Sequence, residues 1–374
     1  MSIKAYCIYN TSERDLNLLY WGNFFAPDPF FALKIDDKTI AFVSELEYGR
    51  CLQTSCFDEV FLFTEVRKDL KKLLPEKPYW LAFFQFLKEK YKIDQFVIPG
   101  DFPAFIYAQI TQEVPIQFDK TFFETQRAIK TPSEITEIKK ACKLTAQGID
   151  FAKTILKQSK IKDQFLYYEG HILTSEGLRS MLEAYCLSLG GYATDTIVCG
   201  GLEASNPHAK GKGALRANEF IVIDFFPRLQ ASHFYGDMTR TLLKGQANAE
   251  QEQLYRCVLE CQQTLISKIR PGVYTNDLMH YALEFFEKAG YGLKPTKNTC
   301  EGFIHSLGHG LGLDLHEYPS VSHTPIKLQA GMVITIEPGL YFKEIGGVRI
   351  EDDILVTLDG CQVLSACDYT LNLA

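Results

Sequence analysis

The sequence lacks the features of exported, disulfide-bonded and membrane-spanning proteins. Its eleven cysteines, an odd number, are scattered between Cys7 and Cys367 without any CxxC pair. It contains no run of 18 or more apolar residues, as a transmembrane helix requires. The stretch MSIKAYCIYNTSERD has polar and charged residues where a signal peptide carries its apolar core. We therefore expect a protein of the reducing cytoplasm that has no membrane partner.

An excess of positive charge is also missing. The 374 residues carry 39 Lys and Arg against 46 Asp and Glu, which gives a formal net charge of −7. Nucleic acid and anionic membranes are therefore poor default partners. Hydrophobic residues make up 46% and charged residues 23%, which excludes disordered, collagen-like and fibrous proteins. At about 150 residues per domain, the length predicts two or three domains, or one large and one small.

Short apolar runs separated by turns fill the first part of the chain. The stretch 77–91 is predicted to form a helix. Five runs predict strands, at residues 5–9, 31–35, 39–44, 59–64 and 95–98. This alternation indicates a small α/β domain that ends near residue 126.

A strong helix start follows this segment. Thr131 can cap the helix, Pro132 suits the first helical position, and Glu134 completes a capping box. Apolar residues recur on one helical face, at positions 135, 138, 142 and 149. We place the domain boundary just before this helix, which divides the chain into residues 1–126 and 127–374.

The second part predicts helices packed on a mostly antiparallel sheet, an α+β fold. Helices are expected at residues 249–268 and 275–289. Strands are expected at residues 196–199, 219–225, 235–243, 332–336, 347–350 and 353–357.

Acidic residues interrupt or end several of these core-like strands. They are Asp224, Asp237, Glu337 and Glu351, and a glycine-flanked His309 lies between them in the sequence. Taken singly, each acid is most simply a strand-end residue that reaches solvent. If all four converge, their repulsion has to be balanced by bound cations. Four carboxylates and one neutral imidazole suit Mn²⁺, Co²⁺, Fe²⁺ or Zn²⁺, and their charge balances two divalent ions.

The glycines beside the imidazole fit the same interpretation. Gly308, Gly310 and Gly312 lie in HSLGHGLGLDLHE, residues 305–317. Residues without a Cβ allow a backbone to pass close to a metal centre. A flexible turn is the alternative.

With these residues the chain resembles the metallopeptidase family that contains methionine aminopeptidase, prolidase and aminopeptidase P. That family has the pita-bread fold and a dinuclear metal centre, and its ligands follow the order Asp, Asp, His, Glu, Glu. The resemblance is strong over 127–374. Residues 1–126 resemble, more loosely, the N-terminal domain of the creatinase–prolidase branch, with DLNLLYWGNF as their best segment.

The resemblance implies a role for each ligand. Asp224 chelates the first metal, Asp237 and Glu351 bridge the pair, and His309 and Glu337 complete the second. Two divalent ions are implied, with Mn²⁺ the first expectation and Co²⁺, Zn²⁺ or Fe²⁺ the alternatives. The nucleophile is a hydroxide between the metals. Glu337 moves the proton, first as general base and then as general acid.

Three further histidines match family positions. His208, in EASNPHAKG, matches an imidazole on the substrate side, and His316, in DLHE, one that contacts the scissile peptide. His305 matches a histidine of the proline-specific members. For His208 and His305 the alternative is an imidazole that supports other site residues without touching substrate. No motif includes the remaining four histidines, at positions 171, 233, 280 and 323.

Arg349 discriminates between members of the family. It lies two residues before Glu351, so a strand directs both side chains to the same face. Methionine aminopeptidases typically carry Gln at this position, whereas prolidase and aminopeptidase P carry Arg. Together with the additional N-terminal domain, this favours cleavage of Xaa-Pro bonds. The alternative role of Arg349 is to orient a neighbouring ligand without substrate contact.

Proline requires a dedicated pocket, because its tertiary amide has no N–H and its ring is rigid. Family members build this pocket partly from a neighbouring subunit, so we expect a homodimer that acts on short peptides with proline at position two. Tyr20 and Trp21 are candidates for an aromatic rim, although a buried core pair is the simpler interpretation.

One segment departs from the family pattern. FFPRLQASHFYG, between Asp224 and Asp237, is about two residues longer than the usual hairpin. The extra length can be absorbed outside the metal centre if both Asp residues lie on paired strands.

The sequence thus favours an Xaa-Pro dipeptidase or Xaa-Pro aminopeptidase. The alternatives are a methionine aminopeptidase-like exopeptidase, a metal-free creatinase-like hydrolase and a non-catalytic pita-bread peptide-binding module. The sequence leaves open the physiological metal, the preferred peptide length and the oligomeric state.

Overall fold

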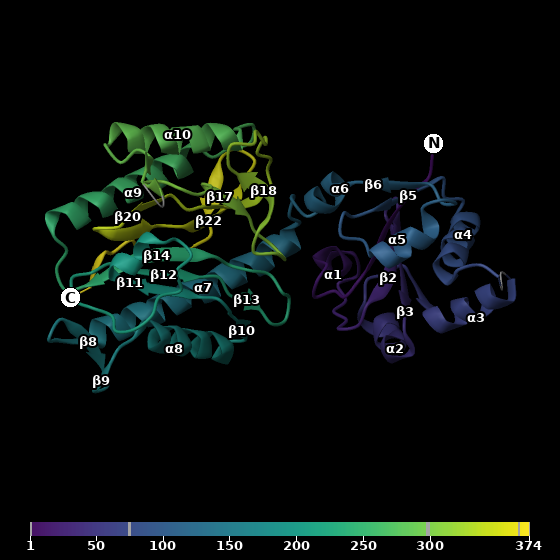
Figure 1. The fold of residues 1–374 in the computed structure, drawn as a ribbon, viewed down its shortest axis with the longest axis horizontal. Coiled ribbons are helices and arrows are strands. Elements are labelled where there is room, and N and C mark those ends of the chain that lie inside the picture. The colour runs from purple at the N-terminus through teal and green to yellow at the C-terminus, as the bar shows by residue number, and fades with distance from the viewer. Residues whose placement is uncertain (1, 74–75, 297–299, 366, 374) are drawn as a thin grey trace. The chain divides into compact units, whose positions relative to one another are not determined.

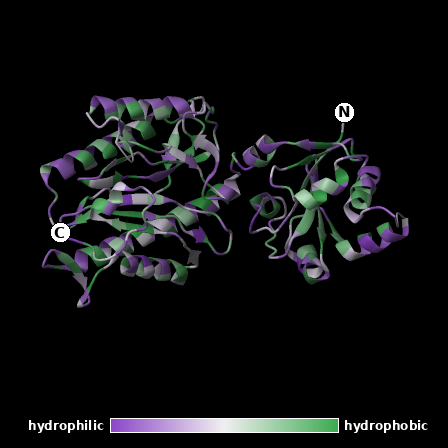
Figure 2. Cartoon of the chain, viewed as in Figure 1, coloured by the Kyte–Doolittle hydropathy of each residue, from purple (hydrophilic) through white to green (hydrophobic). Residues whose placement is uncertain are grey.

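The computed structural model describes residues 2–73, 76–296, 300–365 and 367–373, which fall into two compact units, 1–126 and 127–374 (Figure 1). In each unit the central strands are mostly hydrophobic (Figure 2). Among the described residues, no helix combines the length and apolar character needed to cross a bilayer.

The N-terminal unit is built on one mixed sheet with strand order β4-β3-β2-β1-β5-β6. The strands are β1 (Lys4–Asn10), β2 (Phe30–Ile35), β3 (Lys38–Val43), β4 (Glu59–Leu62), β5 (Gln95–Ile98) and β6 (Ile116–Phe118). The helices are α1 (Leu16–Gly22), α2 (Glu45–Thr54), α3 (Phe63–Leu73), α4 (Tyr79–Tyr91), α5 (Ala104–Ile110) and α6 (Lys120–Thr125).

Both faces of this sheet are buried. Along β2, Phe31 and Leu33 belong to one hydrophobic core, whereas Phe30 and Ala32 belong to another. Successive side chains of a strand point to opposite faces, so the two cores lie on the two sides of the sheet. A strand buried on both faces is continuously apolar, which explains the run FFAL.

Two sequence expectations for this unit need correction. The run 59–64 was expected to be a single strand, but β4 ends at Leu62 and α3 begins at Phe63. Helices α1, α2, α3, α5 and α6 were not anticipated.

The aromatic pair of α1 serves the core of this unit. The Trp21 side chain is buried in the second core, and its Nε1 donates a 2.7 Å hydrogen bond to Gln126 Oε1. Tyr20 is half-buried against the same cluster. Trp21 is therefore a core residue, as the simpler interpretation held, rather than part of an exposed rim.

The C-terminal unit contains two halves, each with two helices on a wholly or mostly antiparallel sheet (Figure 1). In the first half, α7 (Pro132–Gln158) and α8 (Ser175–Ser188) pack on β11 (Ile197–Gly200), β12 (Ile221–Phe225) and β14 (Met238–Lys244). In the second half, α9 (Ala249–Lys268) and α10 (Thr275–Lys288) cover a sheet of order β18-β17-β19-β22-β23. Its strands are β17 (Gly308–Gly310), β18 (Glu317–Val321), β19 (Val333–Ile336), β22 (Asp352–Val356) and β23 (Cys361–Val363).

Short elements complete this unit. They are β7 (Lys160–Lys162), β8 (Phe165–Tyr168), β9 (His171–Ile172), β10 (Gly191–Tyr192), the 3₁₀ helix Gly201–Ser205, β13 (Arg228–Leu229), β15 (Lys294–Pro295), β16 (Cys300–Glu301), β20 (Gly339–Phe342), β21 (Gly346–Arg349) and β24 (Asn372–Leu373).

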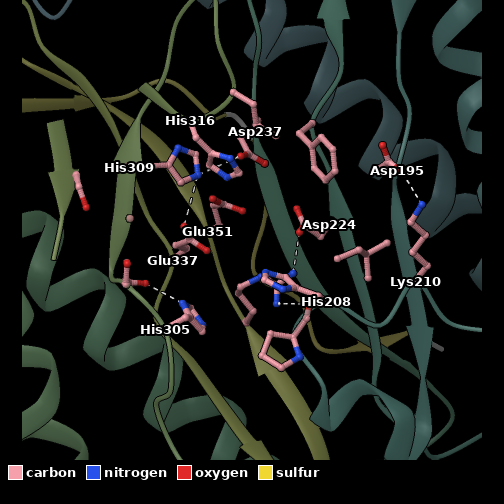
Figure 3. A pocket seen from close by; sticks show the side chains of 18 residues that line it. Asp195, His208, Lys210, Asp224, Asp237, His305, His309, His316, Glu337 and Glu351 are labelled. Carbon is pink, nitrogen blue, oxygen red and sulfur yellow. Dashed lines mark hydrogen bonds and ion pairs between the residues drawn. The ribbon is translucent and has the colours of Figure 1, made fainter. Parts of the chain in front are cut away.

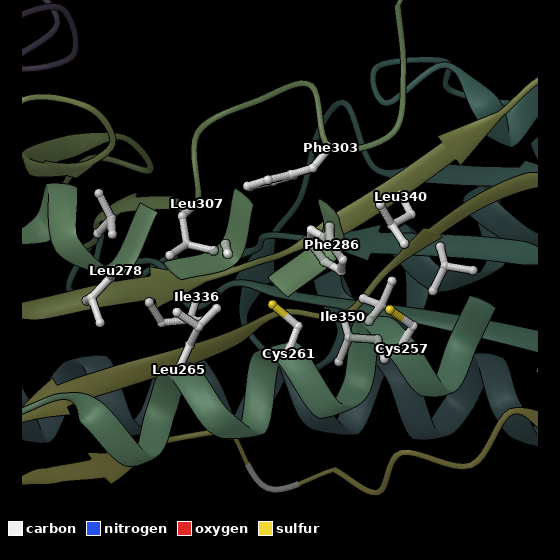
Figure 4. Close-up of a cluster of buried hydrophobic side chains, with 14 of the residues drawn as sticks. Cys257, Cys261, Leu265, Leu278, Phe286, Phe303, Leu307, Ile336, Leu340 and Ile350 are labelled. Atoms are coloured by element: carbon white, nitrogen blue, oxygen red, sulfur yellow. The ribbon is translucent and has the colours of Figure 1, made fainter. Parts of the chain in front are cut away.

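The local signals at the helix starts are realised in the structure. Thr131 Oγ1 accepts from the Glu134 backbone N–H, and Glu134 Oε2 accepts from the Thr131 N–H, so the expected capping box is present on α7. Helix α9 spans the predicted residues. Its Cys257 and Cys261 lie in the core against the second sheet rather than on the helix surface (Figure 4).

Candidate metal centre

Strand register brings the first two acidic residues together. In the antiparallel pair β12–β14, Asp224 lies opposite Thr239. Asp237 precedes Thr239 by two residues, so its side chain shares a face with Asp224. The backbone order along two paired strands therefore determines that both carboxylates face the same side of the sheet.

The longer hairpin between these residues leaves that register intact. Part of it forms β13, which pairs antiparallel with β10 at the edge of the unit. Gly236 then passes against α7, where an added Cβ would lie 2.6 Å from the backbone of Ala141 and Cys142. The hairpin thus pairs with β10 through Arg228 and Leu229, while Phe226 at its start lines the pocket beside Asp224 and Asp237.

A second strand pair supplies the other two acids. Ile336 of β19 lies opposite Asp352 of β22, so Glu337 directly follows one strand and Glu351 directly precedes the other. The Glu351 backbone N–H donates to Thr239 O over 3.1 Å, which joins this strand pair to the first one. His309 comes from β17, next to β19 in the same sheet.

The five predicted metal ligands, the three histidines that match family positions and Arg349 all line one pocket of about 500 Å³ (Figure 3). They are Asp224, Asp237, His309, Glu337, Glu351, His208, His305, His316 and Arg349. The other four histidines are not among the residues that line it.

Three side chains form the tightest group in this pocket. One ligand atom from each of Asp237, His309 and Glu351 lies within 4.8 Å of the others. His309 Nε2 is 3.6 Å from Asp237 Oδ2 and 3.5 Å from Glu337 Oε1. Asp237 Oδ1 is buried and accepts no hydrogen bond from any described residue. A buried, unsatisfied carboxylate oxygen beside an imidazole nitrogen fits a bound cation.

The imidazole of His309 has the tautomer and the protonation state that a metal ligand requires. Its Nδ1 lies 3.1 Å from its acceptor, the backbone carbonyl of Gly310. Because a carbonyl only accepts, Nδ1 carries the proton and Nε2 directs its lone pair toward the carboxylates. Burial lowers the pKa of His309 to about 3, so the ring is neutral.

Without a bound cation, the buried carboxylates destabilise one another's ionised forms. Burial raises the pKa of Asp237 and of Glu351 well above the ordinary range, and neighbouring carboxylates raise both further. Burial also raises the pKa of Glu337 to about 8. Divalent cations would oppose these shifts by stabilising the ionised forms. The donor set therefore fits the metal centre of the resembling family.

Asp224 stands apart from the tight group. Its Oδ2 accepts a 2.7 Å hydrogen bond from Arg349 Nη2. Arg349 Nε donates to Thr239 Oγ1 over 3.1 Å, and that hydroxyl donates to Glu351 Oε2 over 2.7 Å. Arg349 is thus in direct contact with one predicted ligand and connects to another through Thr239.

Tyr341 belongs to the same network, although sequence reasoning missed it. Arg349 Nη1 donates to the Tyr341 hydroxyl over 2.9 Å, and that hydroxyl lies 3.0 Å from His305 Nε2. His305 Nδ1 lies 2.7 Å from the Ser306 carbonyl, which leaves Nε2 to accept from Tyr341. Burial lowers the pKa of His305 to about 3.

The signal for Tyr341 lies in the strand register. Gly339 of β20 pairs with Arg349 of β21, so Tyr341, two residues further along β20, shares a face with the guanidinium. The run GLYF by itself predicts only a buried strand.

The remaining imidazoles occupy different parts of the pocket (Figure 3). The ring of His316 meets that of His309 edge-on, with centroids 4.3 Å apart. His208 follows the 3₁₀ helix Gly201–Ser205, and its backbone N–H donates to Asn206 Oδ1 over 3.2 Å. The structure thus brings both histidines to the pocket wall.

Comparison with known proteins agrees with this geometry. The model of metallopeptidase family M24 matches residues 136–358. An uncharacterized peptidase of Staphylococcus aureus is 38% identical over 241 residues, which cover 64% of this chain and 63% of that protein. The prolidase from Pyrococcus furiosus has a TM-score of 0.77 and 26% identity, covering 97% of this chain and 96% of its own. An X-Pro aminopeptidase from Thermotoga maritima has the same fold, with a TM-score of 0.80, 22% identity, and coverage of 100% and 98%.

The described geometry and these similarities lead to one assignment. The chain belongs to metallopeptidase family M24 and has the pita-bread fold of its creatinase, prolidase and aminopeptidase P branch.

Proposed function

We propose that this protein is a metal-dependent exopeptidase that hydrolyses Xaa-Pro bonds, in dipeptides or at peptide N-termini. The observation that carries the proposal is the convergence of Asp237, His309 and Glu351, with Glu337 3.5 Å from the imidazole, in one pocket. A buried cluster of acids around a neutral imidazole suits divalent cations. Asp224, held by Arg349, completes the ligand set of the family.

The residues divide between two ions. Asp224 would bind the first ion, and His309 and Glu337 would bind the second. Asp237 and Glu351 would bind both ions. Bound divalent cations supply Lewis acidity and lower the pKa of water toward neutrality. Mn²⁺ is the ion we expect, while Co²⁺, Zn²⁺ and Fe²⁺ suit the same ligands.

Glu337 is the residue that handles the proton. Its carboxylate lines the pocket beside the other predicted ligands, with Oε1 3.5 Å from His309 Nε2. A carboxylate in this place can accept a proton from the attacking water and return it to the leaving nitrogen. We assign Glu337 both steps.

The other pocket side chains bind and orient the peptide. His316, next to His309, is placed to contact the scissile peptide, and His208 lies on the substrate side. His305 is held neutral by burial, and its Nε2 is satisfied by Tyr341, which favours a supporting role for this imidazole. Arg349 holds Asp224 and borders the pocket.

Proline specificity rests on Arg349, on the additional N-terminal unit and on the likeness to the Pyrococcus furiosus prolidase. Ile197, Phe226 and Leu315 add apolar surface to a pocket whose volume, about 500 Å³, suits a short peptide. We extend the proposal to a cytoplasmic homodimer, because related enzymes complete the proline pocket with a neighbouring subunit.

A peptide panel with metal analysis tests this function. Protein purified without chelator is analysed for bound metal, supplied with Mn²⁺, and incubated with Leu-Pro, Leu-Pro-Gly-Gly and their Leu-Ala counterparts. We expect release of leucine from the Pro peptides only, and no release by Glu337→Gln. Cleavage of the dipeptide alone indicates a dipeptidase, and cleavage of both Pro peptides an aminopeptidase. Metal-loaded protein that releases no amino acid from any of them contradicts the proposal.

A further inference from the structure

A buried ion cluster lies directly behind the loop that carries His316. The Glu317 side chain is 2% exposed, and its Oε1 is 2.5 Å from Lys130 Nζ. Its Oε2 is 3.1 Å from Arg127 Nε. The side chains of Lys130 and Arg127 are 2% and 10% exposed. None of these three residues lines the pocket, so the chemistry assigned above does not use them.

Further hydrogen bonds fix the position of Lys130 in this cluster. Lys130 Nζ also donates to Arg127 O over 2.7 Å, and the Lys130 backbone N–H donates to Gly331 O over 2.9 Å. Gly312, in the loop between β17 and β18, passes so close that an added Cβ would lie 2.4 Å from Glu317 Oε1. This part of the loop therefore has no freedom to move toward the cluster.

Adjacency in the chain connects the cluster to the pocket. Glu317 is the first residue of β18, and His316 directly precedes it. His316 lies in the bend that leads into this strand, and of the two residues only His316 lines the pocket. Glu317 points to the two cations, while the His316 ring meets His309 edge-on.

We propose that Glu317, clamped by Arg127 and Lys130, is a positioning residue that fixes His316 for its contact with the peptide. The inference rests on the proposed function of His316. An intact ion cluster in the interior adds little stability compared with apolar packing, although removing one partner is costly because the others stay buried and unpaired. Its directional bonds define one geometry. The clamp therefore serves the placement of the neighbouring imidazole rather than the strength of the fold.

A double-mutant cycle tests the coupling. In metal-loaded, full-length protein, Glu317→Gln keeps the side-chain shape and removes the charge. We expect it to lower kcat about 10- to 100-fold with little change in KM, as for other residues that orient an active-site group. In the His316→Ala background the same change should lower kcat less than twofold. Equal effects in the two backgrounds would show that Glu317 does not act through His316.

Two controls separate positioning from loss of structure. Glu284→Gln removes one exposed ion pair with Lys288 on α10 and should leave kcat unchanged. If Glu317→Gln fails to fold, Arg127→Lys weakens the clamp from its more exposed side. That variant should lower kcat in the wild-type background and not in His316→Ala. A loss of kcat of the same size in both backgrounds overturns the inference.

A measurement without substrate keeps this inference separate from the proposed activity. The imidazole signals of His316 in a ¹H–¹⁵N spectrum, identified by their absence in His316→Ala, report the ring environment. We expect them to shift and broaden in Glu317→Gln and to stay in place in Glu284→Gln. Unchanged signals refute the positioning role. If the signals change in the variant but the wild-type protein cleaves no Xaa-Pro peptide, the positioning role of Glu317 is supported and the proposed function is refuted.

Discussion

The guanidinium of Arg349 and the carboxylate of Asp224 form a direct ion pair, with 2.7 Å between Nη2 and Oδ2. The Arg349 side chain is 5% exposed, so it is shielded from water. Through Thr239 the same guanidinium reaches Glu351, and through Tyr341 it reaches His305. One buried cation thus connects two predicted metal ligands and the imidazole that matches a histidine of the proline-specific members.

Replacing this cation should impair both activity and folding. Arg349→Gln leaves Asp224 without its partner in a mostly buried place. We expect kcat/KM for Xaa-Pro peptides to fall about 100-fold or more, which corresponds to roughly 3 kcal/mol. The melting temperature should fall as well. Steady-state kinetics and thermal unfolding measure the two effects. Lys288→Gln, which removes an exposed ion pair with Glu284, is the control and should change neither.

The hydroxyl of Tyr341 should contribute to catalysis more than to stability. Tyr341→Phe keeps the ring and removes the oxygen between Arg349 and His305. We expect kcat to fall about tenfold, because loss of a group that orients site residues has this size of effect. The free energy of unfolding should fall by only about 1 kcal/mol. Tyr274→Phe, at an exposed position, serves as the control for the substitution itself. An unchanged kcat in Tyr341→Phe would show that this hydroxyl does not contribute to catalysis.

Removing metal should reverse the effect of a ligand substitution on stability. In chelated protein the buried carboxylates repel one another, so Asp237→Asn should raise the free energy of unfolding by roughly 1 kcal/mol. With Mn²⁺ present, the wild type should be stabilised and the variant should gain little. Thermal unfolding of the wild type and of Asp237→Asn, each in EDTA and in saturating Mn²⁺, measures the four stabilities. A variant that is less stable than the wild type under both conditions contradicts mutual repulsion in the site.

The metal-free protein should lose stability as pH rises. Asp353 is a buried residue of β22 whose Oδ2 accepts a 2.8 Å hydrogen bond from the Asp237 backbone N–H. In the folded state burial raises the pKa of Glu337 to about 8 and that of Asp353 to about 7, whereas both groups titrate near pH 4 when unfolded. Between these values the folded state binds more protons. The contribution of these two protonated groups to the free energy of unfolding is therefore fully present below about pH 4 and is lost as the pH rises toward 8. Each group contributes a slope of about −1.4 kcal/mol per pH unit where its protonation differs.

Urea unfolding in EDTA at pH 5, 6.5 and 8 measures this dependence. Glu337→Gln should remove part of the slope, because the amide does not titrate. Saturating Mn²⁺ should flatten it, since cations stabilise the ionised carboxylates. A chelated wild type whose stability increases over this range is the opposite result.

Two glycines should respond oppositely to alanine. At Gly236 an added Cβ lies 2.6 Å from the backbone of α7, so Gly236→Ala should cost about 2 kcal/mol or more. The substitution should also weaken metal binding, because the displaced segment carries Asp237. Gly49, inside α2, has open space around its Cβ position, and Gly49→Ala should add about 0.5–1 kcal/mol. Chemical denaturation and isothermal titration with Mn²⁺ measure both variants.

The amino-acid sequence by itself determined the elements whose signals are local. The capping box at Thr131 and Glu134 specified the start of α7, because a helix terminus satisfies its own backbone groups with nearby side chains. The acids at strand ends were recognisable because a charge at the end of an apolar run is unusual. The family resemblance supplied their grouping, and the structure places them in one pocket.

Only the tertiary structure decided the partners of these residues. Thr239 and the Glu317 clamp depend on contacts between segments far apart in the chain, such as Arg127 with Glu317, 190 residues apart. Tyr341 meets Arg349 through the register of the strand pair β20–β21. Trp21 is a core residue because of the layer packed against it, which its own helix does not reveal. Local patterns specify backbone shape and the alternation of faces. Strand register and long-range packing determine which side chains meet, and they depend on the whole fold at once.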